Sequence, residues 1–274
     1  MRSSLEVYEL ATGASRVVLQ SAVLIEAPNW GAEGFLVNAD GRLYRVPFDA
    51  PSLVPVDTGD LIRCNNDHAF TRDGAEILFG CHRGHGAELF AMPVAGGQPR
   101  LMSPEPPTWL HGVAPDGSGM VYCAARGDKS RIDVYTKTWA GTERRLTMGE
   151  GMCDGPDYSA DGAAIYYNCD RSGHAQIWVM SADGGDQRQL FADDHVNWFP
   201  HPSPDGAHVL YLAYPPGTLG HPRDLPVTLC LMKPDAADRQ RVLEFTGGQG
   251  SINVPNWSPD GQSFAYIRYQ TQEP

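Results

Sequence analysis

Four residues with metal-binding side chains recur at nearly even intervals along this chain of 274 residues. They are His68, His111, Asp157 and His201, and each stands five or six residues before the glycine of an Asp-Gly pair. Imidazole nitrogens and carboxylate oxygens are common ligands of divalent cations. If the fold brings the four side chains together in a central channel, they could hold such a cation there. The alternative is that they line a hydrated channel or hydrogen-bond to neighbouring elements.

A second set of basic and imidazole side chains follows two of these Asp-Gly pairs. The set is His82, Arg83, Arg171 and His174. The chain is acidic overall, with a formal net charge of −12. Basic groups gathered on one face of such a protein would suit an anionic small molecule such as a uronate, or an acidic peptide. For both arginines, the alternative is a hydrogen bond within their own loop. The predicted ligand-binding set comprises His68, His82, Arg83, His111, Asp157, Arg171, His174 and His201.

These residues must be positioned by a repeated hairpin whose clearest copy is N-V-P-N-W-S-P-D-G, residues 253–261. Pro259 suits the second position of a type I turn, and Gly261 can adopt the positive φ that closes it. The turn-ending glycines are Gly34, Gly74, Gly117, Gly162, Gly206 and Gly261. A β-rich run follows each turn, then a polar loop and two further runs. Four strands in about 40 to 45 residues is the size of a propeller blade.

The two ends of the chain predict a closed ring. The sixth unit stops after its second strand, and the first 20 residues (L-E-V-Y-E-L, A-T-G-A-S, R-V-V-L) have the form of a third strand, a turn and a fourth strand. The sequence therefore predicts an all-β, six-bladed propeller with four antiparallel strands per blade, closed by the N-terminal strands. We expect a single domain, 1–274, with blades at about 22–60, 61–103, 104–149, 150–193, 194–246 and 247–274 plus 1–21.

The W-S-P-D-G turn, the C-D-R-S-G loop (169–173) and the I-W-V-M strand (177–180) resemble the propeller repeats of TolB-like proteins. The resemblance covers essentially the whole chain. In that family the propeller binds other proteins in periplasmic translocation, carries a His-rich metal site in oligogalacturonate lyases, or is an accessory domain of peptidases. The chain lacks the N-terminal α/β domain of the first group and the hydrolase domain of the last. The resemblance therefore implies the fold more strongly than the function.

In such a ring the Asp-Gly turns share one face, and the blade connections and second-to-third strand loops share the other. Eight of the nine histidines, His85 among them, fall on the second face. A concave mouth rimmed by imidazoles is where a ligand is expected. The sequence therefore predicts a non-catalytic module that binds a protein or a small ligand at this mouth. The alternative is a metal-dependent carbohydrate-active enzyme that resembles oligogalacturonate lyases.

Composition restricts the partners and the compartment. The acidic surface disfavours nucleic acid and anionic lipid, and no apolar run is long enough to insert into a membrane. If Met1 is the natural start, the absence of a signal sequence predicts a cytoplasmic protein, whereas the resemblance allows a periplasmic one. The six cysteines lack C-x-x-C spacing and are expected to be reduced and buried. Four aromatic residues, Trp30, Phe70, Tyr158 and Trp257, stand four residues before their glycines and are expected to pack between blades.

Overall fold

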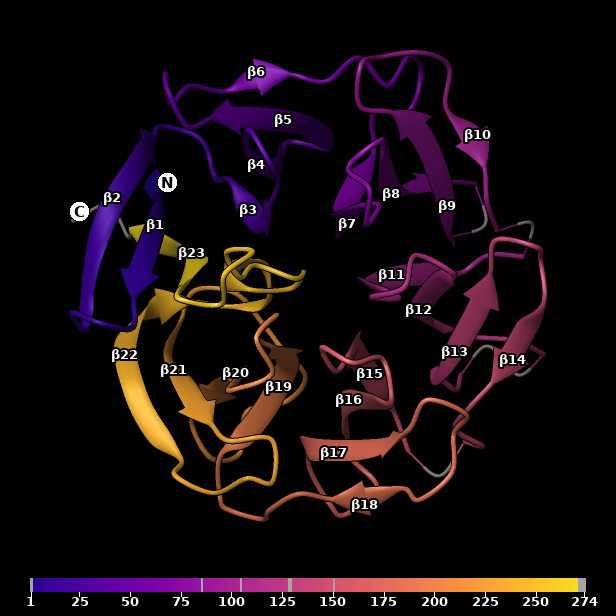
Figure 1. The fold of residues 1–274 in the computed structure, drawn as a ribbon, viewed down its shortest axis with the longest axis vertical. Helices are drawn as coiled ribbons and strands as arrows, with labels where there is room; N and C mark the ends of the chain where they lie inside the picture. The colour runs from indigo at the N-terminus through magenta and orange to yellow at the C-terminus, as the bar shows by residue number, and fades with distance from the viewer. Residues whose placement is uncertain (1, 85, 104, 128–129, 150, 271–274) are drawn as a thin grey trace.

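The computed structural model describes residues 2–84, 86–103, 105–127, 130–149 and 151–270. In these ranges 23 strands form six antiparallel sheets around a central axis, and one short 3-10 helix lies outside the sheets (Figure 1). No helix of the described chain is long and apolar enough to cross a bilayer. The prediction of a six-bladed β-propeller is confirmed.

Each sheet is a blade whose strands are antiparallel to their neighbours, and the first strand of blades 1 to 5 lies closest to the axis (Figure 1). Blade 1 contains β3 (Glu26–Trp30), β4 (Gly34–Ala39), β5 (Arg42–Pro47) and β6 (Val54–Pro55). Blade 2 contains β7 (Cys64–Phe70), β8 (Glu76–Arg83), β9 (Gly86–Pro93) and β10 (Arg100–Leu101). Blade 3 contains β11 (Thr108–Val113), β12 (Gly119–Ala124), β13 (Asp133–Thr138) and β14 (Glu143–Arg145).

The remaining blades follow the same order. Blade 4 contains β15 (Cys153–Tyr158), β16 (Ala164–Cys169), β17 (Gln176–Ser181) and β18 (Arg188–Gln189). Blade 5 contains β19 (Val196–Pro202), β20 (Val209–Tyr214), β21 (Leu225–Met232) and β22 (Gln240–Gly247). Blade 6 contains β23 (Ser263–Gln270), β1 (Arg2–Glu9) and β2 (Ala14–Ser21), and its innermost position is reduced to one bridge between Trp257 and Phe264.

The N-terminal strands close the ring as predicted, because β1 pairs with β23 from Arg2↔Gln270 to Glu9↔Ser263. A buried carboxylate reinforces this pairing. Glu6 of β1 accepts hydrogen bonds from Arg268 (2.9 and 3.2 Å) and from Ser4 (2.7 Å). Burial alone would raise the pKa of Glu6, but these hydrogen bonds outweigh burial and lower it. The closure therefore depends on an ion pair as well as on a strand ladder.

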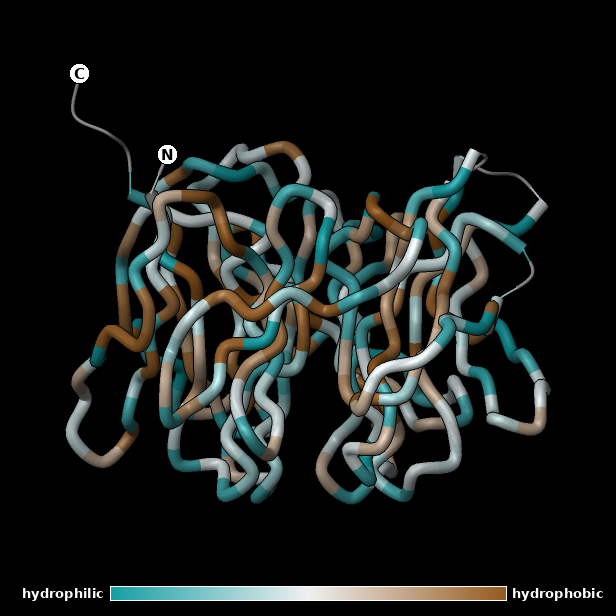
Figure 2. The backbone as a smooth tube through the Cα atoms, turned by 90° about the horizontal axis from the view of Figure 1, so that it is seen from above, coloured by the Kyte–Doolittle hydropathy of each residue, from teal (hydrophilic) through white to brown (hydrophobic). Residues whose placement is uncertain are grey.

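The loops lie on two faces, which are named here for what they contain. The turn face carries the Asp-Gly turns and the third-to-fourth strand turns, and the connection face carries the blade connections and the second-to-third strand loops. Figure 2 shows short turns along the lower rim and longer loops along the upper rim. Arg2 and Gln270, the first and last described residues, pair at the end of blade 6 opposite the turn between β1 and β2, which is the connection face.

The hydrophobic core lies between blades rather than within them. Each of six clusters joins one blade to the next, as with Leu78 and Leu89 of blade 2, which share a cluster with Leu110 and Tyr122 of blade 3. The other five clusters make the corresponding contacts around the ring. A blade thus buries its apolar faces only when both neighbours are present.

The repeated Asp-Gly turns are held by their own side chains. In the clearest copy, Ser258 Oγ donates to Asp260 Oδ1 (2.6 Å) and accepts a bond from the Ser263 N–H (3.0 Å). Gly261 has a φ of 71°, and its N–H bonds to Ser258 O (2.9 Å) as a type I turn requires. The same hydroxyl–carboxylate bond recurs at Thr71–Asp73, Ser159–Asp161 and Ser203–Asp205. The motif therefore stabilises the turn.

A β-bulge interrupts the innermost strand in blades 1 to 5. The register shifts fall between Glu26 and Asn29, Cys64 and His68, Leu110 and Gly112, Asp154 and Asp157, and Trp198 and His201. In three blades, one residue of the bulge has a positive φ, namely Ala27 (56°), Gly155 (58°) and Phe199 (54°). Bulges change the direction of the side chains that follow them. The residues predicted to carry chemistry therefore lie where the strand changes its pairing.

The expectation that all six cysteines are reduced is wrong for two of them. Cys153 and Cys169 form a disulfide, and they face each other in the register of β15 and β16 with Cα atoms 4.1 Å apart. Cys64 and Cys81 are register partners in blade 2 in the same way but remain thiols. Spacing along the sequence does not show this pairing, because the partners belong to different strands of one hairpin.

Candidate functional site

The channel segment, residues 248–256, occupies the axis of the ring where blade 6 lacks a regular innermost strand (Figure 1). It includes the 3-10 helix η1 (Gln249–Ser251). Its carbonyl groups accept hydrogen bonds from three blades: Ile252 O from His201 (2.6 Å), Asn253 O from His111 (3.4 Å) and Pro255 O from Asn29 (2.6 Å). Asn253 in turn donates to Asp67 Oδ1 of blade 2 (3.0 Å). These bonds fix the segment across the channel.

Two histidine–aspartate pairs flank the channel segment. His111 Nε2 lies 3.1 Å from Asp154 Oδ1, and His201 Nδ1 lies 2.9 Å from Asp157 Oδ2. Burial disfavours the charged form of His111, but the hydrogen bond and charge of Asp154 outweigh burial and raise the pKa of His111. Burial likewise acts against Asp154, yet His111 holds the pKa of that carboxyl well below its usual range. For Asp157, burial dominates and raises the pKa despite the bond to His201.

Two further ionisable groups extend the pair between His111 and Asp154. His221, from the loop between β20 and β21, places its Nε2 3.7 Å from Asp154 Oδ2. Burial lowers the pKa of His221, with the charge of Asp154 acting in the opposite direction. Asp67 is fully buried, which raises its pKa to about 6. We refer to His111, Asp154, His221 and Asp67 as the His111 cluster.

The four residues predicted to share a cation do not converge. His68 turns toward blade 1, where its Nε2 donates to Ala27 O (2.7 Å) and contacts Leu36 O (3.3 Å). Burial lowers the pKa of His68 to about 4, so the ring is neutral at physiological pH. His201 and Asp157 bond to each other, and His111 faces Asp154 instead. Of the four, only His111 belongs to a set of three or more ligand side chains within the described chain.

The four loop candidates are spread over two blades. In blade 2, His82 and Arg83 end β8, and Arg83 pairs with Glu88 (3.5 Å). In blade 4, Arg171 stacks on Trp178, with its guanidinium 3.8 Å from the ring centre, and bonds to Gln187. His174 Nε2 lies 2.9 Å from Asp193 O. These side chains thus contact their own blade or the adjoining connection. His85 lies outside the described residues.

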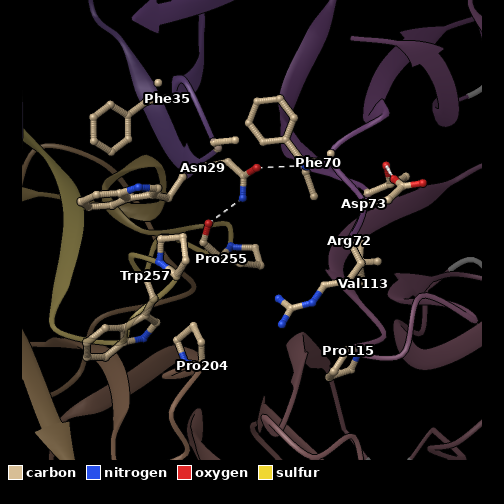
Figure 3. Close-up of a pocket in the computed structure, with 18 of the residues that line it drawn as sticks. Asn29, Phe35, Phe70, Arg72, Asp73, Val113, Pro115, Pro204, Pro255 and Trp257 are labelled. Atoms are coloured by element: carbon tan, nitrogen blue, oxygen red, sulfur yellow. Dashed lines mark hydrogen bonds between the residues drawn. The ribbon is translucent and has the colours of Figure 1, made fainter. Parts of the chain in front are cut away.

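The central cavity lies on the turn face and has a volume of about 870 Å³ (Figure 3). The residue four before the turn-ending glycine lines it in every blade: Trp30, Phe70, Val113, Tyr158, Pro202 and Trp257. The aromatic side chains expected only to pack between blades therefore also form an apolar collar. Asn29 and Pro255 lie deeper, joined by the bond that fixes the channel segment. A cavity of this size and character fits a small ligand or a short peptide.

Arg72 is the basic residue that projects toward the middle of this cavity. Figure 3 shows its guanidinium pointing into the space between Pro255 and Pro115. The side chain is exposed, and no hydrogen bond or ion pair joins it to any part of the chain that the structure describes. The nearby carboxylate of Asp73 is engaged by Thr71 Oγ1 (2.6 Å) and the Ala75 N–H (3.0 Å). The guanidinium thus retains its donors for a ligand.

Sequence reasoning did not single out Arg72, but a signal was present. Most of the turns read P-D-G or A-D-G, and the second blade reads R-D-G. The candidate ligands predicted from the sequence stand five and six residues before the glycine, whereas Arg72 stands two before it. Asp67, Asp154 and Cys123 give no such signal in the sequence. They lie on three different strands, β7, β15 and β12, and only the fold brings them close to His111.

The ring and its axial cavity define the class of protein: a six-bladed β-propeller with a ligand-sized site at its centre. The family model of the TolB β-propeller domain matches residues 107–220. The uncharacterized protein Atu1656 of Agrobacterium fabrum is 43% identical over 279 residues, covering 98% of this chain and 93% of that protein. The chain belongs to the TolB-like β-propeller family.

Solved structures agree with this assignment. One from Agrobacterium tumefaciens, with a provisional TolB designation, superposes with a TM-score of 0.96 at 42% identity and covers 99% of both chains. TolB from Acinetobacter baumannii gives a TM-score of 0.69 at 20% identity, over 90% of this chain and 64% of that one. An oligogalacturonate lyase in complex with manganese gives 0.58 at 12% identity, over 95% and 77% of the two chains. The last two show a shared fold alone.

Proposed function

We propose that this propeller is a non-catalytic binding module whose central cavity receives an acidic, aromatic-containing segment of a partner protein. The observation that carries the proposal is Arg72, an unpaired guanidinium that faces a collar of aromatic and proline side chains. A guanidinium binds carboxylates through two parallel hydrogen bonds, and aromatic walls favour flat, apolar side chains. Family resemblance supports a protein partner.

The preference for an acidic ligand follows from what else surrounds the cavity. Glu33, Asp73, Asp157 and Arg45 also line the cavity. Arg45 donates to Val94 O, and the carboxylates of Asp73 and Asp157 accept bonds from Thr71 and His201, so Arg72 is the lining cation whose donors are not engaged by the described chain. A ligand carboxylate inside the cavity gains a charge-assisted bond there and loses little hydration at the open rim. A basic or neutral peptide gains the apolar contacts alone.

A random peptide library displayed on phage tests the proposal. Selection on the wild-type protein is expected to enrich Asp or Glu next to Trp, Tyr, Phe or Pro. Arg72→Glu should remove the acidic preference and favour Lys or Arg instead. Arg144→Glu makes the same charge change on an exposed residue of the outer strand β14 and should select as wild type does.

Two outcomes count against this function. One is a selection that enriches no consensus from the wild-type protein. The other is an acidic consensus that persists unchanged in Arg72→Glu, because binding would then take place elsewhere, for example at the His-rich mouth of the connection face.

A saccharide ligand is the second candidate, since a uronate also offers a carboxylate on a compact ring. The corresponding enzyme would be a metal-dependent lyase. Its chemistry needs a base next to the sugar, and no histidine is among the described residues that line the cavity. Incubation with oligogalacturonate and Mn²⁺ distinguishes the two: unsaturated products would favour the lyase, whereas binding without turnover favours a module.

A further inference from the structure

We propose that His111, Cys123 and Asp154 form a Zn²⁺ site at the buried end of the channel, with His221 as the fourth ligand. The ligand atoms of His111, Cys123 and Asp154 all lie within 4.8 Å of one another, and all three residues are buried. The three residues come from β11, β12 and β15, so two blades contribute to the site. The site is separate from the cavity on the turn face and does not depend on the proposed function.

The distances fit tetrahedral zinc. With bonds of about 2.0 Å to nitrogen or oxygen and about 2.3 Å to sulfur, the ligand atoms of such a site stand about 3.3 to 3.7 Å apart. His111 Nε2 and Asp154 Oδ1 are separated by 3.1 Å, and His221 Nε2 lies 3.7 Å from the other oxygen of Asp154. Small movements would bring His111, Cys123 and Asp154 to one ion, and His221, which lies outside the set of mutually close ligand atoms, would have to move nearer to the other ligands to complete the four.

The donor types select the metal. A mixture of imidazole, thiolate and carboxylate is typical of Zn²⁺, whereas Ca²⁺ and Mg²⁺ prefer ligand sets made of oxygen alone. When the ion binds, Cys123 would release its thiol proton to solvent and His111 would release the Nε2 proton that it donates to Asp154. The resulting thiolate and the Asp154 carboxylate balance the two charges of the ion, so a buried complex carries no net charge.

The surroundings orient the ligands and leave a path for the ion. The Asn253 carbonyl, 3.4 Å from His111 Nδ1, accepts a hydrogen bond that directs Nε2 toward the site. The rings of Trp198 and Phe199 pack on His221 with centroids 4.5 and 5.4 Å away. The His221 side chain is 22% exposed, whereas that of His111 is 2% exposed. An ion can therefore enter from the connection face and meet His221 first.

The test uses the full chain stripped of metal with a chelator and then titrated with Zn²⁺, Co²⁺ or Mg²⁺. We expect one Zn²⁺ per chain, no uptake of Mg²⁺, and a near-ultraviolet thiolate-to-cobalt charge-transfer band in the Co²⁺ form. Cys123→Ser should abolish the band and weaken Zn²⁺ binding by more than about 100-fold. Cys230→Ser removes another buried thiol, in blade 5, and should leave both unchanged.

A second pair of variants keeps the test informative if Cys123→Ser fails to fold. His221→Gln should weaken Zn²⁺ binding about tenfold while the metal-free melting temperature stays close to wild type. His174→Gln, also in a second-to-third strand loop, should bind as wild type does. A Co²⁺ form without the charge-transfer band, or wild-type affinity in His221→Gln, would overturn the site and leave the His111 cluster as a network of ion pairs.

Discussion

His68 is a fully buried histidine whose ring nitrogen Nε2 bonds to backbone carbonyl groups of blade 1. Its pKa is lowered to about 4 by burial, whereas an unfolded chain has a histidine pKa of about 6.5. Between these values the unfolded state binds more protons, so the free energy of unfolding falls as pH falls from about 6.5 to about 4. The loss across the window from this one group is up to about 3 kcal/mol.

His68→Gln isolates this contribution. A glutamine amide can donate to Ala27 O in place of Nε2 but does not titrate. Urea unfolding at pH 7 and pH 4.5 should therefore show a smaller loss of stability on acidification in the variant than in the wild type. Parallel pH dependence in the two proteins would mean that His68 is not the buried titrating group.

Gly155 supports the bulge of blade 4 with a conformation that other residues resist. Its φ is 58°, and an added Cβ would lie 2.6 Å from Asn168 Oδ1 and 2.9 Å from the ring of Phe199. Gly155→Ala should therefore cost at least about 2 kcal/mol of unfolding free energy.

The matched variant is Ala27→Gly, because Ala27 has a φ of 56° at the equivalent place in blade 1. Relief of the left-handed conformation offsets the added backbone entropy, so the change should stay within about 1 kcal/mol. Chemical denaturation measures both variants. Equal costs at the two positions would show that the crowding around Gly155 is not decisive.

At this scale the sequence predicted residue types better than their partners. The sequence selected His111 as a possible cation ligand together with His68, Asp157 and His201, whereas in the structure His111 contacts Asp154. A bulge between Asp154 and Asp157 displaces the two carboxylates to different histidines. A repeat position in the sequence does not encode that displacement, since only the pairing of two strands defines it.

Among the elements, the channel segment departs most from the repeat. It replaces an innermost strand, and Asn253 holds it to blade 2 through bonds to Asn66 O (3.1 Å) and Asp67 Oδ1 (3.0 Å). Asn253→Ala removes both buried bonds and should lower the unfolding free energy by about 2 to 4 kcal/mol.

Asn253→Asp is the sharper comparison, since it keeps the size of the side chain. It would place a carboxylate next to that of Asp67, so it should destabilise the fold more than Asn253→Ala does at neutral pH. Urea unfolding compares the two variants. An aspartate variant as stable as the wild type would contradict the close approach of Asn253 and Asp67.

The turns and strands were predictable because each blade repeats the same local rules. The path of the channel segment was not predictable, although it includes the start of N-V-P-N-W-S-P-D-G, the clearest copy of the repeated motif. Its turn, Ser258 to Gly261, follows local chemistry. Its first half, from Asn253, is set by hydrogen bonds to residues more than 100 positions away.

For the whole molecule, stability depends on ring closure, because the hydrophobic core is shared between neighbouring blades. Deleting residues 1–20 would remove Leu5 and Val7 from the cluster shared with blade 1 and Tyr8 from the cluster shared with blade 5. We expect the truncated protein to lose cooperative unfolding rather than fray at one end. Near-ultraviolet circular dichroism during heating checks this, and an unchanged melting curve would contradict it.

Glu6→Ala is a milder test of the same closure. It leaves Arg268, 28% exposed, without its carboxylate partner and should cost about 3 kcal/mol at neutral pH. Because the pKa of Glu6 is lowered in the folded state, the stability it contributes is present above about pH 4.5 and is lost as pH falls. The difference between variant and wild type should therefore shrink in acid. Val17→Ala on the exposed side of β2 is the control.

The channel segment also lies across the central axis of the ring (Figure 1). The carbonyl groups of the segment bond to blades 1, 3 and 5 and the Asn253 side chain bonds to blade 2, so the segment joins the floor of the cavity to the His111 cluster. A solute that enters the cavity from the turn face therefore meets Pro255 of the channel segment. Pro255 lines the cavity and Asn253, two residues away, contacts His111, so one short segment touches both sites.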